Sequence, residues 1–314
     1  MAKRGKQKRK TTAKGPLGAV LALILAALGG TAVTCRPDRW LDDRAGGNAS
    51  PSDASPSDAS PVGAPQGAHM ALGAPVLVAR GKRAATDDHL LVKPQYALAY
   101  SRSRGGPSWV SWRLDASWFG DAPRHKGRFL VDDSLPEGWE RIGHDDYTNS
   151  GYDRGHMVRS EERTRNDVDN KATFLLTNIL PQRHELNAGP WLRLEERCQD
   201  LAQKEGRALH VVAGGIYGDR PDTFGKGVAV PDAFYKIAVV LGKTQGVKDV
   251  GPTTRVIAVI MPNSATIQDE PWTRYRVSVD EIERRSGYDF LTAVPADVQK
   301  VIEARVDDAA AAAP

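Results

Sequence analysis

Cysteine is scarce in this chain: Cys35 and Cys198 are the only two among 314 residues. They lie in very different segments, so neither an internal disulfide nor a zinc site of the Cys₂His₂ type is expected. Cys198 falls in a stretch that is expected to be helical, where we interpret it as a small buried apolar residue. The length of 314 residues and the apolar content of 40% suffice for a sizeable core.

A surplus of positive charge is also lacking outside the N-terminus. The formal net charge is +4, but residues 1–14 contain seven of the 43 lysines and arginines and no acid. The rest of the chain has 36 basic and 39 acidic residues, which is a net charge of −3. If the folded part binds nucleic acid, a local arginine-rich groove must attract it, because the overall charge does not.

Residues 16–33 form an apolar run directly after the basic stretch. This order is typical of an export signal. The run is also near the lower limit for spanning a bilayer, so an uncleaved membrane anchor through residues 16–33 is an alternative. Lipid attachment at Cys35 is a third option, which the preceding Ala32-Val33-Thr34 fits poorly. Each reading predicts an exported protein that is secreted, periplasmic or membrane-anchored, with its folded part outside the cytoplasm.

Composition divides the chain into four segments. Residues 1–34 form the signal peptide or signal anchor, and residues 35–73 form a disordered linker rich in Ser, Pro, Asp, Ala and Gly. Residues 74–306 form the folded domain, and residues 307–314 form an Ala-rich tail.

Within the folded domain, short runs of apolar and β-branched residues predict strands at residues 76–79, 96–101, 109–115, 174–177, 209–213, 235–241 and 255–261. Helices are expected at residues 190–204, 279–285 and 295–305. Pro190 suits a first helical turn, and Ser278 with Glu281 can form a capping box. Many strands, few helices and no regular strand–helix alternation indicate an α+β fold around a mainly antiparallel sheet flanked by helices.

The polar motif Asp153-Arg154-Gly155-His156 is followed by Asn178, and then by Asn187 with Glu195 eight residues later. An imidazole suits a general base near neutral pH. Hydrated Mg²⁺ needs only one or two oxygen ligands from protein, and arginine binds phosphate oxygens with its planar fork. These residue types together indicate metal-assisted attack on a phosphodiester.

These residues resemble the DNA/RNA non-specific endonucleases, a family that includes secreted sugar-non-specific bacterial nucleases and mitochondrial endonuclease G. The similarity extends over about residues 96–302 and includes residues 173–182, 279–283 and 287–291. The resemblance implies a ββα-metal (His–Me finger) core. In that core a strand carries the histidine, and a following helix carries the metal-binding asparagine.

The resemblance also implies roles for the motif. His156 deprotonates the attacking water, and Asn187 is the one direct protein ligand of Mg²⁺, for which Mn²⁺ is a possible substitute. Glu195 orders metal-bound waters. Without the motif, Asn187 would be interpreted as a turn residue and Glu195 as an exposed helix charge.

Further residues are assigned to substrate binding and to structural support of the site. Arg154 is expected to contact phosphate, with a salt bridge to an acid such as Asp153 as the alternative, and Asp153 is expected to fix its loop. The resemblance implies an arginine that stabilises the developing charge at phosphorus. Arg124 is the candidate and Arg128 its rival, because the length of this segment varies.

Asn178 is expected to hold the loop that positions Asn187, whereas His144 and His184 are interpreted as structural or solvated. One departure from the family follows the motif histidine. Arg159 stands there with Glu161 and Glu162, and these charges could alter substrate preference.

The sequence thus predicts an Mg²⁺-dependent, sugar-non-specific endonuclease that hydrolyses DNA and RNA and leaves 5′-phosphates. One alternative is a toxin-type nuclease with a partner protein inhibitor. Another is a relative that binds nucleic acid without cutting it, against which the presence of His156 and Asn187 argues.

Overall fold

The structure of the chain is a computed structural model that describes residues 67–78 and 87–309. These residues belong to one compact unit, Pro61–Pro314. The expected signal or anchor and most of the expected linker lie outside the described residues. Within the described ranges, no helix combines the length and apolar character needed to cross a membrane.

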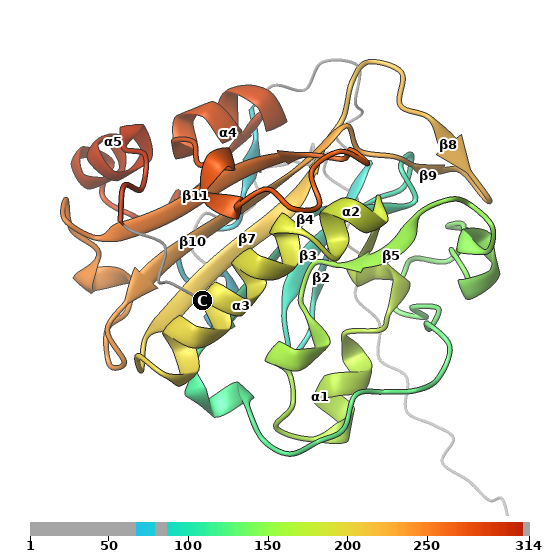
Figure 1. Cartoon of the computed structure of the whole chain (residues 1–314), viewed down its shortest axis with the longest axis horizontal. Coiled ribbons are helices and arrows are strands. Elements are labelled where there is room, and N and C mark those ends of the chain that lie inside the picture. The colour runs from blue at the N-terminus through green and yellow to red at the C-terminus, as the bar shows by residue number, and fades with distance from the viewer. Residues whose placement is uncertain (1–66, 79–86, 310–314) are drawn as a thin grey trace, which may run out of the picture. The chain divides into compact units, whose positions relative to one another are not determined.

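A six-stranded antiparallel sheet forms the centre of the fold, in the spatial order β11-β10-β7-β4-β3-β2 (Figure 1). Its strands are β2 (Asp88–Val92), β3 (Ala97–Ser101), β4 (Gly106–Leu114), β7 (Ala208–Ile216), β10 (Ala233–Leu241) and β11 (Arg255–Pro262). Because helices cover both faces, the central strands are apolar almost without interruption instead of alternating with polar residues.

Three layers result from this arrangement. Helix α3 (Pro190–Gln203) covers one face, where its Trp191 packs in one apolar cluster with Trp112 of β4. Helices α4 (Val279–Ser286) and α5 (Ala296–Ala304) cover the opposite face, with Ile282 and Ile302 packed among side chains of β10 and β11. Each of these fully buried side chains stabilises the fold by roughly 1.5–3 kcal/mol.

A separate antiparallel ribbon on the α3 side consists of β5 (Asp153–His156) and β6 (Ile179–Gln182). The chain continues from β6 into the short helix α2 (His184–Asn187) and then into α3, with Pro190 at the first position of α3. This order of strand, strand and helix brings the motif histidine, Asn187 and Glu195 into adjacent elements.

Smaller elements complete the fold. They are the pair β1 (Val76–Leu77) and β12 (Tyr288–Asp289), the pair β8 (Thr223–Phe224) and β9 (Val228–Ala229), and helix α1 (Asp167–Ala172). The 3₁₀ helices are Ala68–Met70, Ala116–Trp118, His144–Tyr147, Ser160–Glu162, Leu176–Asn178, Val247–Asp249 and Trp272–Tyr275.

The expected α+β class with an antiparallel sheet is confirmed. The strand expected at residues 174–177 is wrong, because the chain there leads into the 3₁₀ helix Leu176–Asn178. Its apolar residues are buried, as they would be in a strand, but the backbone turns so that Asn178 points into the protein. The strand expected at residues 76–79 forms only as β1, and residue 79 lies outside the described part.

The packed structure extends beyond residues 74–306 at both ends. Met70 and Leu72, which the sequence assigns to the linker, are buried in the cluster beneath α4 and α5. Asp307, which it assigns to the tail, is buried and accepts hydrogen bonds of 2.9 Å from Nε and Nη2 of Arg255. The composition did not predict these two boundaries, because each end of the domain is held by contacts with strands that are far away in the sequence.

Candidate active site

His156 ends strand β5 in a pocket of aromatic rings. Its ring centroid lies 5.3 Å from that of Phe129 and 4.9 Å from that of Phe174, which meets it edge-on. Its Nε2 is buried and has no hydrogen-bond partner in the described part of the chain. Burial, followed by the positive charge of Arg124, lowers the pKa of His156 to about 3. The imidazole is therefore neutral near pH 7 and able to accept a proton.

Asn178 holds the backbone that follows His156. Its Oδ1 accepts a 3.0 Å hydrogen bond from Val158 N, and its Nδ2 donates to Val158 O at 3.0 Å and to Thr173 O at 2.9 Å. These contacts correct one detail of the prediction. Asn178 supports the segment of the histidine, and its side chain does not bond the loop that carries Asn187.

Asn187 ends helix α2 with its side-chain amide oriented by Asp153. Asn187 Nδ2 donates to Asp153 Oδ2 at 2.9 Å, and His184 Nδ1 lies 2.9 Å from the same oxygen. Among the described residues, no donor occupies Asn187 Oδ1. This oxygen is therefore free to serve as a ligand, and oxygen ligands are what a hard divalent cation such as Mg²⁺ prefers.

Glu195 is buried on the sheet-facing side of α3, which rules out the reading as an exposed helix charge. Its Oε1 accepts a 3.2 Å hydrogen bond from Lys236 Nζ, and its Oε2 lies 3.9 Å from Arg159 Nε. Burial raises the pKa of Glu195, while Lys236 and Arg159 oppose that rise. The two cations therefore favour the carboxylate form.

The sequence analysis missed Lys236, which lies inside strand β10 with its ammonium group over the ring of Trp191 at 4.2 Å. A single lysine within an otherwise apolar nine-residue strand was the available signal, because a charge is rarely buried without a partner. Glu162 also lies near this lysine and accepts a 2.8 Å hydrogen bond from Trp112 Nε1. Burial raises the pKa of Glu162 to about 7, against the opposing effect of Lys236.

Arg154 leaves its positive charge available for an anion. Its Nη2 donates to the carbonyl of His144 at 2.7 Å, and its guanidinium lies 5.7 Å from the ring centroids of Phe129 and Tyr147. The alternative salt bridge with Asp153 is not formed, and no other ion pair of Arg154 occurs between described residues. An arginine held in this way can contact phosphate.

His144 and His184 differ in their surroundings. His144 Nδ1 accepts a 3.1 Å hydrogen bond from the backbone N–H of Phe129, so it supports the segment that packs on His156. His184 is largely exposed and touches Asp153.

Arg124 lies closer to the base than Arg128 does. Its guanidinium is 5.0 Å from the ring of Phe174, its Nη1 bonds Glu161 Oε1 at 2.8 Å and also Ser160 Oγ, and its charge lowers the pKa of His156. This geometry favours Arg124 over Arg128 as the arginine that meets the reacting phosphate.

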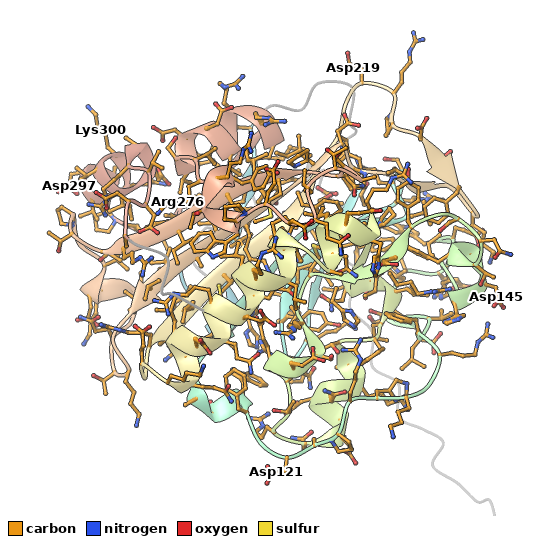
Figure 2. The ribbon with its side chains drawn as sticks, viewed as in Figure 1. Asp121, Asp145, Asp219, Arg276, Asp297 and Lys300 are labelled. Carbon is orange, nitrogen blue, oxygen red and sulfur yellow. The ribbon has the colours of Figure 1, made fainter. Side chains whose placement is uncertain are left out.

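Arg128 lies farther out, where it pairs with the exposed carboxylate of Asp145 at the edge of the molecule (Figure 2). It borders an open cavity of about 490 Å³ that Phe129 and His144 also line. Phe129 packs on His156 and also lines this cavity, but His156 is not among the lining residues.

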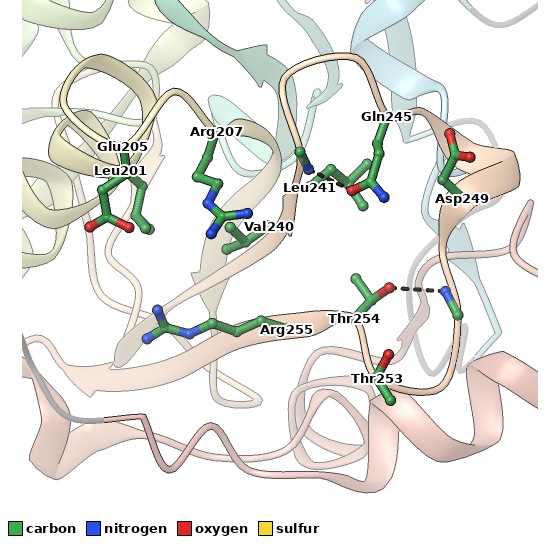
Figure 3. A pocket seen from close by; sticks show the side chains of 12 residues that line it. Leu201, Glu205, Arg207, Val240, Leu241, Gln245, Asp249, Thr253, Thr254 and Arg255 are labelled. Carbon is green, nitrogen blue, oxygen red and sulfur yellow. Dashed lines mark hydrogen bonds between the residues drawn. The ribbon is translucent and has the colours of Figure 1, made fainter.

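A separate cavity of about 340 Å³ lies between the end of α3 and the loop after β10 (Figure 3). Leu201, Glu205, Val240 and Arg255 are among its lining residues, and none of its lining residues belongs to the motif. The guanidinium of Arg255 is already held by Asp307. This cavity is therefore not the candidate active site.

Comparison with known proteins agrees with this geometry. Residues 74–297 match the profile of a family described as DNA/RNA non-specific endonuclease. The chain is 42% identical over 241 residues to a protein named Nuclease from Nostoc sp. (strain PCC 7120 / SAG 25.82 / UTEX 2576), and the alignment covers 76% of this chain and 86% of the relative. It is 28% identical over 211 residues to the mitochondrial endonuclease G of Homo sapiens, covering 63% of this chain and 68% of the relative.

A solved structure of an EndoG/EndoGI complex contains a similar fold. The TM-score is 0.61 at 27% sequence identity, over 75% of this chain and 95% of that chain. The family match spans most of the packed structure and includes every motif residue from Arg124 to Glu195. This chain therefore belongs to the DNA/RNA non-specific endonucleases and is an endonuclease with the ββα-metal fold.

Proposed function

We propose that this endonuclease is Mg²⁺-dependent, hydrolyses the phosphodiester bonds of both DNA and RNA, and leaves 5′-phosphates. One observation carries the proposal: Asp153 of strand β5 orients the amide of Asn187, and the same strand ends in His156, whose imidazole is neutral. A base and a free oxygen ligand are thus held on adjoining elements. Enzymes of this family depend on a metal ion, and a single neutral protein ligand fits hydrated Mg²⁺.

In this proposal His156 removes a proton from the water that attacks phosphorus in line. Asn187 Oδ1 would hold the ion, and Glu195 would orient water beside it. When bound, Mg²⁺ supplies positive charge to the phosphate and its leaving oxygen. The Nη groups of Arg124 donate hydrogen bonds to the phosphate oxygens as charge develops there, and Arg154 keeps the phosphate in place.

Cleavage of both DNA and RNA requires contacts that ignore the base and the sugar 2′-position. The arginines assigned above bind phosphate, and phosphate contacts position a nucleic acid without reading its sequence. The net charge of −3 outside residues 1–14 supports the same view, since attraction is then confined to a local groove.

Digestion of plasmid DNA and of single-stranded RNA tests the proposal. We expect both substrates to be cut with Mg²⁺ or Mn²⁺, no cleavage in EDTA, and product ends that a 5′-phosphate-dependent exonuclease degrades. Tight binding without cleavage under every metal condition would instead identify a nucleic-acid-binding relative that lacks catalysis.

A protein inhibitor is a second candidate feature. The similar solved structure is described as an EndoG/EndoGI complex that explains EndoG inhibition. We infer by analogy that this chain can be blocked by a protein that covers the surface around His156 and Asn187, as a toxin-type nuclease would require. Co-purification with products of neighbouring genes tests this point, and a bound protein that stops cleavage is the supporting result.

We further propose that the enzyme acts outside the cytoplasm. The basic residues 1–14 and the apolar residues 16–33 support export, with either cleavage near residues 33–35 or a retained membrane anchor. N-terminal sequencing of the mature protein separates these two forms. Intact chain recovered only from the cytoplasm would overturn both.

A further inference from the structure

Three carboxylates converge between helices α4 and α5, on the face of the sheet opposite α3. Asp280 and Glu283 lie three residues apart on α4 and therefore share a face of that helix. Glu303 comes from the last turn of α5. One oxygen from each of the three lies within 4.8 Å of the other two. Calcium–oxygen bonds measure about 2.3–2.6 Å, so ligands on opposite sides of one ion are about 5 Å apart.

Glu303 has a buried oxygen without a partner. The residue is 6% exposed, and its Oε1 accepts no hydrogen bond in the described part of the chain. Gln299 interacts with the carboxylate and lowers its pKa, but this contact does not satisfy Oε1. A buried carboxylate oxygen without a hydrogen bond or a cation is strongly unfavourable. The site is therefore incomplete as the protein alone provides it.

The basic side chains of α4 and α5 have other surroundings than these three acids, as far as the described residues show. Arg284 of α4 lines the same surface depression as Asp280 and Glu283, but Glu281 engages its guanidinium through hydrogen bonds of 2.7 and 2.6 Å. Lys300 on α5 projects into solvent (Figure 2). Between described residues, no ion pair joins any of the three carboxylates to a lysine or arginine. Burial first, and then the charge of Glu283, raise the pKa of Glu303 to about 8.

The cluster is open to solvent on one side. Asp280 and Glu283 border a depression of about 520 Å³, which Tyr288 and Asp289 of β12 also line. Asp289 thus adds a fourth carboxylate at the rim, and the depression has room for the water ligands that an ion needs to complete its shell. Calcium takes six to eight oxygen ligands in flexible geometry, whereas Mg²⁺ prefers only one or two carboxylates and most of its waters.

We propose that Asp280, Glu283 and Glu303 bind one Ca²⁺-like divalent cation that links α4 to α5. The ion takes the place of the proton that Glu303 otherwise holds. Since α4 and α5 cover one side of the core, the site stabilises that layer and is separate from the site at Asn187. An oxygen-only ligand set excludes the softer metals that favour histidine or cysteine.

Calcium binding to the full-length chain with Asn187→Ala tests the proposal, because that substitution removes the anchor of the other metal site. We expect calorimetry to find one Ca²⁺ site with a Kd of roughly 10⁻⁴–10⁻³ M, the range of exposed extracellular sites. About 10 mM Ca²⁺ should then raise the thermal midpoint by roughly 3–10 °C. Terbium luminescence excited through the nearby Tyr288 provides a second readout.

Two variants in the same background supply the comparison. Glu283→Gln/Glu303→Gln should lose the calcium-dependent rise while unfolding in EDTA at the same or a higher temperature, because carboxylate repulsion is removed. Asp297→Asn, which removes an exposed charge of α5 outside the cluster, should keep the rise. The proposal is overturned if Asn187→Ala binds no Ca²⁺, or if the double variant binds it as tightly as the background.

Discussion

Burial decides the chemical form of the reactive side chains. The imidazole of His156 is neutral because its aromatic pocket and Arg124 disfavour the protonated form. Glu195 is instead favoured in its charged form, because Lys236 and Arg159 oppose the rise in its pKa that burial causes. One site thus contains a weak base and a carboxylate whose states are set by neighbours.

Substitution of the base and of the metal ligand should separate their functions. His156→Ala should lower the cleavage rate by about 10²–10⁴-fold, because the proton acceptor is lost, and more Mg²⁺ should not restore it. Asn187→Ala should regain activity as Mg²⁺ is raised, since its defect is ion affinity. Glu195→Gln should respond in the same direction but less. Rates across a Mg²⁺ titration, with circular dichroism as the folding control, provide the measurement.

Wild-type rates for His156→Ala would refute the mechanism. Recovery of His156→Ala at high Mg²⁺ would show instead that the histidine serves the ion and not the proton transfer.

Lys236 should contribute to stability as much as to activity. Lys236→Met leaves the buried Glu195 with only Arg159, at 3.9 Å, as a cationic neighbour, and removing one partner of a buried pair destabilises a protein by about 3–5 kcal/mol. Lys236→Met/Glu195→Gln should regain most of that loss, because the side chain at position 195 is then neutral. Urea unfolding of the single and double variants measures the coupling. Additive effects of the two substitutions would mean that the pair is not coupled.

At the scale of elements, the β5–β6 ribbon depends on a residue without a side chain. A Cβ at Gly155 would lie 2.6 Å from Cγ of Gln182, which is fully buried and cannot move into solvent. The close approach of the two strands places His156 opposite Ile179 in register. Glycine is therefore required here by space, since no positive φ is involved.

Gly155→Ala should force the strands apart, at a cost of about 1–3 kcal/mol for overpacking, and should reduce cleavage by displacing His156. Gly246→Ala is a matched control, because a Cβ there meets no atom within 4 Å. Unfolding free energies and cleavage rates of both variants test the prediction. Equal behaviour of the two would show that the ribbon tolerates the methyl group.

At the scale of the whole molecule, buried histidines tie stability to pH. Burial, then the charge of Arg113, lowers the pKa of His210 to about 4, while the unfolded chain binds that proton near pH 6.5. The unfolded state therefore binds more protons between these values. Stability from this group is fully present above pH 6.5 and is lost as the pH falls toward 4, by about 3 kcal/mol in total.

His210→Leu should reduce this acid sensitivity. The comparison with wild type is needed because Glu162 and Glu303, whose pKa values are raised to about 7 and about 8, act in the opposite direction as the pH falls. Urea unfolding at pH 7 and pH 4 should show a smaller loss of stability in the variant. An equal loss of stability in the variant and the wild type would show that another group causes the acid sensitivity.

The charge distribution predicts how salt affects substrate binding. With a net charge of −3 outside residues 1–14, only a few phosphates should be neutralised. The slope of log K against log salt should therefore be shallow, about −2 to −5, at about 0.9 per phosphate. Fluorescence anisotropy with catalytically inactive His156→Ala measures it. A slope near −10 would reveal a much larger basic surface.

The sequence by itself determined the family and the broad fold. His156, Asn187 and Glu195 are candidates because their motif resembles that of the DNA/RNA non-specific endonucleases, and the long apolar strands and three longer helices lie within a few residues of their predicted positions. These features are local in the chain. Short-range sequence patterns predict strands and helices directly. An apolar run indicates a strand, and a proline is typical of a helix start.

Only the tertiary structure decided how these residues are partnered. It orients the amide of Asn187 through Asp153, buries Glu195 against Lys236, and brings Glu303 of α5 to Glu283 of α4. Each contact joins residues 20 or more positions apart. Burial and electrostatic interaction depend on distance in space, so a local pattern contains no record of them until the chain has folded.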